Sequence, residues 1–341
     1  MRIFFLPLVL LVAPHPATAQ WIPQSSGTDA ELRGLSVVSA DAVWASGQRG
    51  TVVRTTDGGR RWTADTVPSA AKLELRAIAG TSATVAHALS IADSGRIFRT
   101  SDGGRTWSLR FMSLRKGSFL DAIRFWDARH GIAVSDPVDG RFLLVTTSDG
   151  GDSWTELPTD RLPLALPNEG AFAASGSCLA TYGSENVWFV TGGASVARIF
   201  HSPDRGKSWT VHDTSIRAGG TSEGIFSVAF RDAKHGVIAG GDYQKAKLGG
   251  RNLALTSDGG ASWTLVDSAR APSGFKSAVA YVPGTAGRKL VAVGLNGTDV
   301  SSDGGLTWMA TDTVAYNSVQ FAGKGGYAVG SKGKIARYSM P

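Results

Sequence analysis

One short motif recurs six times along the 341-residue chain and constrains its fold more than any other feature. The motif is Ser/Thr-x-Asp-x-Gly-x-Ser/Thr-Trp, and its first copy departs from the pattern by carrying Arg61 at the seventh position. Successive copies lie 45, 47, 55, 54 and 45 residues apart. Spacings of about 40–50 residues between short apolar segments are typical of β-propeller blades. The six Asp and Trp positions are Asp57 and Trp62, Asp102 and Trp107, Asp149 and Trp154, Asp204 and Trp209, Asp258 and Trp263, and Asp303 and Trp308.

The residues around each motif predict four short strands with turn signals between them. An inner strand comes first, a second apolar strand ends in small residues, a third strand leads into the motif, and the Trp opens a fourth. Together they form one antiparallel blade. Seven such sets begin near Leu35, Leu75, Asp121, Ser177, Phe226, Ser277 and Asn317.

The seventh set stops after its third strand, so a blade of four strands needs a strand from elsewhere. Residues 20–23 (Gln-Trp-Ile-Pro) resemble the Trp-led strands that follow each motif. We therefore predict an all-β, seven-bladed propeller whose last blade is closed by the N-terminal strand, which removes exposed sheet edges. The 322 residues from Gln20 onward divide into seven units of 46 residues.

Residues 1–19 have the composition of a secretory signal peptide. Arg2 is the positive charge, an apolar stretch too short to span a bilayer follows, and an Ala-Thr-Ala cleavage site ends at Ala19. We expect cleavage after Ala19, export to the periplasm or the extracellular space, and a single propeller domain over residues 20–341. No later apolar run reaches membrane-spanning length, so we expect no stable membrane insertion.

The sequence offers little for metal, cofactor or nucleic-acid chemistry. Cys178 is the only cysteine, which excludes an internal disulfide and a Cys-based zinc site. Neither a Gly-x-Gly-x-x-Gly nor a Cys-x-x-Cys motif is present, so we expect no cofactor. His130 and His235 lie in matching Asp-Ala-Arg/Lys-His-Gly segments, which favours a role in turns over metal binding. Since the net charge of +7 comes from scattered Arg and Lys, we also expect no nucleic-acid partner.

Each part of the repeated motif has a structural explanation. The Asp carboxylate can accept backbone N–H bonds across a tight turn, and Gly supplies the positive φ that such a turn needs. The Trp ring is expected to pack between blades, where burying about 150–250 Å² contributes on the order of 4–6 kcal/mol. The alternative of six calcium loops lacks the necessary density of carboxylates, so we expect no metal.

Candidate binding residues gather in the loops of three successive blades. In a propeller, the loops between second and third strands and the connections between blades share one face. On that face the loops of blades 3–5 are the longest, and long loops in compact domains are often functional. The candidates are Asp136, Asp139, Arg141, Glu169, Arg198, Glu223, Asp242, Tyr243, Lys245 and Arg251, with Arg115 and Lys116 nearby.

These residues predict a mixed-charge groove at the mouth of the central channel. Such a surface suits a protein client, a glycan or another polar ligand. The competing interpretation is that the loops are merely longer and solvated. We expect the propeller to be a monomer.

The motif resembles the Asp-box, or BNR repeat, which is also found in sialidases. The whole pattern from Gln20 onward resembles the photosystem II stability/assembly factor family, and within it the non-photosynthetic bacterial branch. That resemblance implies an exported seven-bladed propeller that binds a membrane-protein client as an assembly scaffold. Asp-boxes also occur in unrelated enzymes, so they indicate architecture and not chemistry.

Two enzymatic alternatives stay open. A sialidase-like glycoside hydrolase would use Asp136, Glu169 or Asp242 as carboxylates and Tyr243 as nucleophile. However, Arg96-Ile97-Phe98 and Arg198-Ile199-Phe200 lack the proline of the Arg-Ile-Pro segment typical of sialidases. An oxidoreductase is suggested only by the names that some family members carry. We expect a binding scaffold, with a hydrolase or glycan-binding propeller as the alternative.

Overall fold

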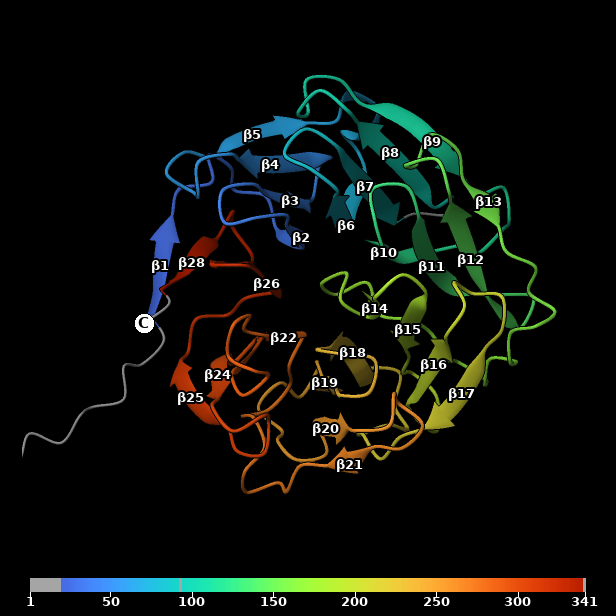
Figure 1. Ribbon diagram of the computed structural model, residues 1–341, viewed down its shortest axis with the longest axis vertical. Coiled ribbons are helices and arrows are strands. Elements are labelled where there is room, and N and C mark those ends of the chain that lie inside the picture. Colours follow the sequence, from blue (N-terminus) through green and yellow to red (C-terminus); the bar gives the residue numbers. More distant parts are fainter. Residues whose placement is uncertain (1–19, 92–93, 340–341) are drawn as a thin grey trace, which may run out of the picture.

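Seven four-stranded antiparallel sheets stand around a central axis and form a β-propeller (Figure 1). The structure is a computed structural model that describes residues 20–91 and 94–339. The predicted signal peptide lies outside the described residues. Within them, the only helix is one 3-10 turn, Pro68–Ala70, and no helix is long and apolar enough to cross a bilayer.

The strand order repeats from blade to blade, as the sequence predicts. The innermost strands of blades 1–7 are β2 (Leu32–Val37), β6 (Glu74–Gly80), β10 (Leu120–Phe125), β14 (Leu179–Tyr182), β18 (Glu223–Phe230), β22 (Ala278–Tyr281) and β26 (Ser318–Ala322). The second strands are β3 (Val43–Gly47), β7 (Ala86–Ile91), β11 (Gly131–Val138), β15 (Asn186–Val190), β19 (Gly236–Asp242), β23 (Leu290–Gly294) and β27 (Gly325–Val329). The third strands are β4 (Thr51–Thr55), β8 (Arg96–Thr100), β12 (Arg141–Thr147), β16 (Arg198–Ser202), β20 (Leu253–Thr256), β24 (Gly297–Ser301) and β28 (Ile335–Ser339). The outermost strands are β5 (Thr63–Thr66), β9 (Ser108–Met112), β13 (Thr155–Glu156), β17 (Thr210–Asp213), β21 (Thr264–Leu265), β25 (Met309–Asp312) and, in blade 7, β1 (Gln20–Gln24).

The N-terminal strand closes the ring, which confirms the predicted closure. β1 pairs antiparallel with β28, with Gln20 opposite Ser339 and Gln24 opposite Ile335. Trp21 anchors the strand: its indole N–H donates to the Thr298 hydroxyl at 2.9 Å in blade 6. The first and last strands of the ring therefore share one sheet (Figure 1).

The repeated motif forms the turn between the third and fourth strands of blades 1–6. In blade 2, the Thr106 N–H donates to the Asp102 carboxylate at 3.0 Å, and the Thr106 hydroxyl donates to its other oxygen at 2.6 Å. These bonds from Thr106 and those from Thr100 lower the pKa of Asp102 to about 2. In blade 1, Arg61 has no hydroxyl, and only its backbone N–H reaches Asp57.

Three tryptophans of the motif, Trp62, Trp107 and Trp154, contact aromatic rings of the preceding blade, and most of the six are less buried than the sequence suggests. Trp154 is 8% exposed, and its ring centroid lies 5.8 Å from Phe125 and 6.2 Å from His87 in blade 2. Trp62 is also 8% exposed and meets Tyr327 of blade 7. The stabilisation of about 4–6 kcal/mol expected for a fully buried tryptophan ring therefore applies only to Trp62 and Trp154. The rings of Trp107, Trp209, Trp263 and Trp308 stay partly exposed.

A segment of the long connection into blade 4 crosses the axis of the ring, a feature that no motif in the sequence indicates. We call residues 171–177 the plug. The Ser175 hydroxyl donates to the Ser277 carbonyl of blade 6 at 2.9 Å, and the Ser318 hydroxyl of blade 7 donates to the Ser175 carbonyl at 3.3 Å. The Ser177 hydroxyl donates to the Ser227 hydroxyl of blade 5 at 2.9 Å.

The plug also contacts the first three blades. Arg33 of blade 1 donates to the Ala174 carbonyl at 3.3 Å, and the Ala171 N–H donates to Asp136 of blade 3 at 2.8 Å. Gly176 has a φ of +65°, and a Cβ at this position would lie 3.1 Å from the Cβ of Ala77 in blade 2. The plug thus contacts each of the other six blades. It therefore lies across the channel, at the end where the inner strands begin.

Candidate functional site

A cavity of about 820 Å³ opens on the face that carries the blade connections, which we call the loop face. The plug forms part of its floor through Ala171, Phe172 and Ala173. Its walls come from four adjacent blades, 2–5, and from the connection into blade 4. The remaining lining residues are Arg76, Gly117, Phe119, Asp136, Pro137, Gly140, residues 165–170, Gly192, Gly193 and Thr221.

Among the predicted site residues, Asp136 lines this cavity and has a strongly raised pKa. The sequence places it in a loop, but a bulge lets β11 continue through Val138, which pairs with Arg141. Burial raises the pKa of Asp136 to about 6, against the hydrogen bond from the Ala171 N–H. This carboxyl group in the cavity wall therefore stays protonated to a higher pH than an ordinary aspartate.

Two charged residues of the inner strands, Asp121 in β10 and Arg76 in β6, lie near Asp136, and neither was predicted as a site residue. Asp121 is fully buried in β10, where it is the unpaired residue of a bulge between Leu120 and Ala122 in the pairing with β11. Burial, and next the neighbouring Asp136, raise the pKa of Asp121 well above its ordinary value, while Arg76 acts in the opposite direction. No sequence signal could have revealed this pair, because strand register alone brings the two residues together.

Glu169 and Arg198 form a buried ion pair and hold the cavity wall. Arg198 Nε donates to Glu169 Oε1 at 2.8 Å, and its Nη2 donates to Glu169 Oε2 and to the Leu164 carbonyl. Glu169 and Arg198 are 5% and 7% exposed, and Thr191 donates to the same carboxylate at 2.6 Å. Both were predicted as loop residues that contact a ligand. In the structure, their charged groups instead pair with each other.

Asp242 and Glu223 also stabilise loops. Asp242 is 2% exposed and accepts bonds from the Ser222 hydroxyl at 2.8 Å and the Gln244 N–H at 3.0 Å. Burial alone would raise the pKa of Asp242, but these bonds and Lys245 outweigh it and lower the pKa. Glu223 begins β18 and accepts the Gly220 N–H at 3.1 Å.

The remaining candidates present polar or aromatic surface to solvent. Tyr243 is 42% exposed, and the Lys245 side chain is 70% exposed. Asp139 is at the hairpin tip with a φ of +53°, and Arg115 lies 3.7 Å from its carboxylate. Arg251 is exposed and donates to the Ser215 carbonyl at 2.9 Å, while Arg141 is half-buried at the start of β12. The ten predicted residues thus divide into a buried scaffold and an exposed set.

The histidines and the cysteine have structural surroundings. His130 and His235 contact Asp127 and Asp232 at 2.9 Å in equivalent turns. Cys178 is fully buried beside the plug, and burial raises its thiol pKa well above the ordinary value. Over residues 20–91 and 94–339, no group of three His, Cys, Asp or Glu side chains is placed to hold a metal ion.

No family model matches the chain, and no curated protein matches it in sequence. The structure "YCF48 bound to D1 peptide" has a TM-score of 0.68 and 19% identity, and the match covers 94% of this chain and 97% of that one. YCF48 from Cyanidioschyzon merolae has a TM-score of 0.65 and 19% identity, covering 94% and 99%. A GH74 xyloglucanase from Xanthomonas campestris has a TM-score of 0.63 and 16% identity, covering 93% of this chain and 53% of that chain. The predicted resemblance is thus confirmed at the level of fold: this chain is a seven-bladed propeller whose fold is similar to that of YCF48.

Proposed function

We propose that the chain is an exported scaffold protein that binds a segment of a protein client in the loop-face cavity. The observation that carries this proposal is the cavity of about 820 Å³ between the loops of four adjacent blades. Concave sites between structural units are the usual place for ligands. A similarly folded YCF48 structure holds a D1 peptide, which supports a protein ligand for this architecture.

The cavity walls are suited to a backbone that enters from one side. The plug crosses the channel and lines the cavity with Ala171, Phe172 and Ala173, so we expect a ligand to enter from the loop face. A Cβ added to Gly117 or Gly140 would meet nothing within 4 Å, so the rim at these two residues is open. The buried Glu169–Arg198 pair fixes the opposite wall. A fixed site loses less conformational entropy on binding.

Blocking the cavity tests this proposal. Thr221 is an exposed residue that lines the cavity, so Thr221→Trp should fill it without disturbing the core. Thr313 is an exposed threonine in the connection into blade 7, away from the cavity, and Thr313→Trp is the matched control. Affinity capture from an envelope extract should recover a client with wild type and Thr313→Trp but not with Thr221→Trp. Equal recovery with all three would reject the cavity as the binding site.

Glycan hydrolysis is the second candidate, and Asp136 is the observation that favours it. A carboxyl group with a pKa of about 6 in an open cavity can act as a general acid. The fold is also similar to about half of a xyloglucanase chain, which supports testing for hydrolase activity. Release of reducing sugar from xyloglucan or sialyl-lactose by wild type, and its loss in Asp136→Asn, would establish this alternative.

A further inference from the structure

The longest loop between second and third strands lies in blade 5 and is basic and partly apolar. We call residues 243–252 the blade-5 insert. It carries Lys245, Lys247 and Arg251 and has no acidic residue. Within the described part of the chain, its only ion pair joins Lys245 to the buried Asp242, 3.8 Å away. The insert therefore presents positive charge that the protein itself barely neutralises.

Apolar side chains lie among these charges. Tyr243 and Leu248 of the insert are 42% and 40% exposed, and Leu295 of the adjacent blade-6 loop is 48% exposed. The neighbouring Asn296 donates from its side-chain amide to the Ala246 carbonyl, which ties the two loops together. Exposed apolar groups interleaved with uncompensated charges of one sign are typical of an interaction surface.

The insert is held in one conformation from both sides. On the blade-6 side, the Phe275 N–H donates to the Ala246 carbonyl at 2.8 Å. On the other side, Arg217 Nη2 donates to the Gly249 carbonyl at 3.1 Å. A loop fixed in this way pays little ordering entropy when it binds a partner.

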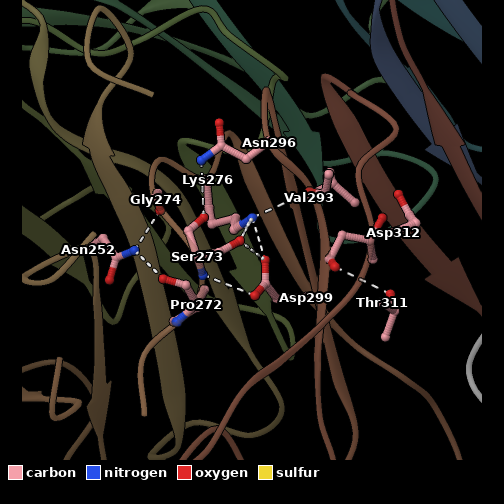
Figure 2. Close-up of polar contacts among 12 residues, drawn as sticks. Asn252, Pro272, Ser273, Gly274, Lys276, Val293, Asn296, Asp299, Thr311 and Asp312 are labelled. Atoms are coloured by element: carbon pink, nitrogen blue, oxygen red, sulfur yellow. Dashed lines mark hydrogen bonds and ion pairs between the residues drawn. The ribbon is translucent and has the colours of Figure 1, made fainter. Parts of the chain in front are cut away.

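A buried polar network below the insert explains this rigidity (Figure 2). Asn252 is fully buried and donates to the Pro272 carbonyl at 2.9 Å and to the Gly274 carbonyl at 2.5 Å. Ser273, between these residues, donates from its N–H to Asp299 at 3.0 Å. Asp299 in turn pairs with the fully buried Lys276 at 2.5 Å. The ion pair thus fixes the connection on which the insert rests.

An aromatic row joins the insert to the cavity. The Phe172 ring, in the cavity lining, stacks on Phe226 with centroids 4.0 Å apart. Tyr243 meets Phe226 edge-on at 6.0 Å. The Tyr243 N–H also donates at 3.3 Å to the carbonyl of Ser222, which directly follows the lining residue Thr221. The insert and the cavity are therefore neighbouring parts of one surface.

We propose that the blade-5 insert docks an acidic, extended segment of a protein partner that also carries apolar side chains. Carboxylates of that segment meet Lys245, Lys247 and Arg251, and its apolar groups cover Tyr243, Leu248 and Leu295. The inference rests on the proposed function and specifies the chemistry of the client beside the cavity. A chain can follow this surface into the cavity, whereas a flat bilayer surface cannot, so a protein segment is favoured over anionic lipid.

The test is a selection from a random-peptide library displayed on phage, with the chain from Gln20 onward as bait. The test variant carries Lys245→Glu and Lys247→Glu. The matched control reverses two exposed lysines in turns on the opposite face, Lys207→Glu and Lys234→Glu. The selected peptides are then measured by fluorescence anisotropy, and flotation with equal parts phosphatidylglycerol and phosphatidylcholine tests the membrane.

We expect wild type to select peptides rich in Asp, Glu and large apolar residues. The test variant should bind them at least about tenfold more weakly, because each reversal replaces attraction by repulsion, while the control variant should not. Selection without acidic enrichment, with binding lost only in Thr221→Trp, would overturn this inference and leave the proposed function standing. Vesicle binding that needs Lys245 and Lys247, without peptide binding, would overturn it in favour of a membrane. If no peptide depends on Thr221, the proposed function itself fails.

Discussion

Replacing Trp154 tests how the repeated motif holds neighbouring blades together. Trp154 is 8% exposed and packs against Phe125 and His87. A tryptophan ring of about 150–250 Å² at about 25 cal/mol per Å² corresponds to roughly 4–6 kcal/mol of burial. Measured losses for Trp→Ala in protein cores are about 3–5 kcal/mol. We therefore expect Trp154→Ala to lower the free energy of unfolding by about 3–5 kcal/mol in urea titrations followed by far-UV circular dichroism.

Phenylalanine replacements separate packing from hydrogen bonding in the same motif. The Trp154 indole N–H has no acceptor among the described residues, whereas the Trp62 N–H donates to Gln24 Oε1 at 2.8 Å. Trp154→Phe should cost less than about 1.5 kcal/mol because the ring contact persists. Trp62→Phe should cost about 1 kcal/mol more than Trp154→Phe, because it also removes the hydrogen bond to the half-buried Gln24. A loss below about 1 kcal/mol for Trp154→Ala, within the range of ordinary substitutions, would refute the packing argument.

Three further outcomes follow from the same geometry. The raised pKa of Asp136, about 6, means that the folded state holds this proton more tightly than the unfolded state. The contribution of Asp136 to the free energy of unfolding should therefore fall by about 2–3 kcal/mol as the pH rises from 4 to 6. Urea unfolding at several pH values should show this decrease in wild type and not in Asp136→Asn. Lys276→Met should cost about 3–5 kcal/mol by leaving Asp299 buried and unpaired, and adding Asp299→Leu should recover much of that loss in thermal unfolding. Arg61→Ser should add a hydrogen bond from the serine hydroxyl to Asp57 and raise the free energy of unfolding by about 1 kcal/mol in urea titrations. An unchanged free energy of unfolding would contradict the proposed role of this hydroxyl in the motif.

The fold was predictable because every blade repeats the same local instructions. Six motifs fixed six turns, and the likeness of residues 20–23 to the Trp-led strands revealed how the ring closes. The inner strands begin within a few residues of the predicted positions, for example at Leu32 and Leu120. Local turn chemistry and strand alternation determine such features, and both can be seen in a short stretch of sequence.

The candidate site was less predictable because long-range pairing determines it. Glu169 and Arg198 both looked like loop charges available to a ligand, yet they bind each other across 29 residues of chain. The sequence likewise gives no sign that residues 171–177 cross the channel. Asp121 was named only as the start of a strand, and its proximity to Asp136 follows from register. Loop length did indicate where the cavity lies, since loops of blades 3–5 make up most of its walls.

Site-specific photocrosslinking tests the central claim, that a protein client binds in the loop-face cavity, most directly. A benzoyl-phenylalanine is placed at Thr221 in the cavity lining, at Thr313 elsewhere on the same face, or at Glu185 in an exposed turn on the opposite face. The three proteins are irradiated in an extract of the source cells. A protein crosslinked from position 221, and not from 313 or 185, is the result that we expect. Absence of any crosslink from 221, or equal crosslinking from all three positions, would contradict the claim.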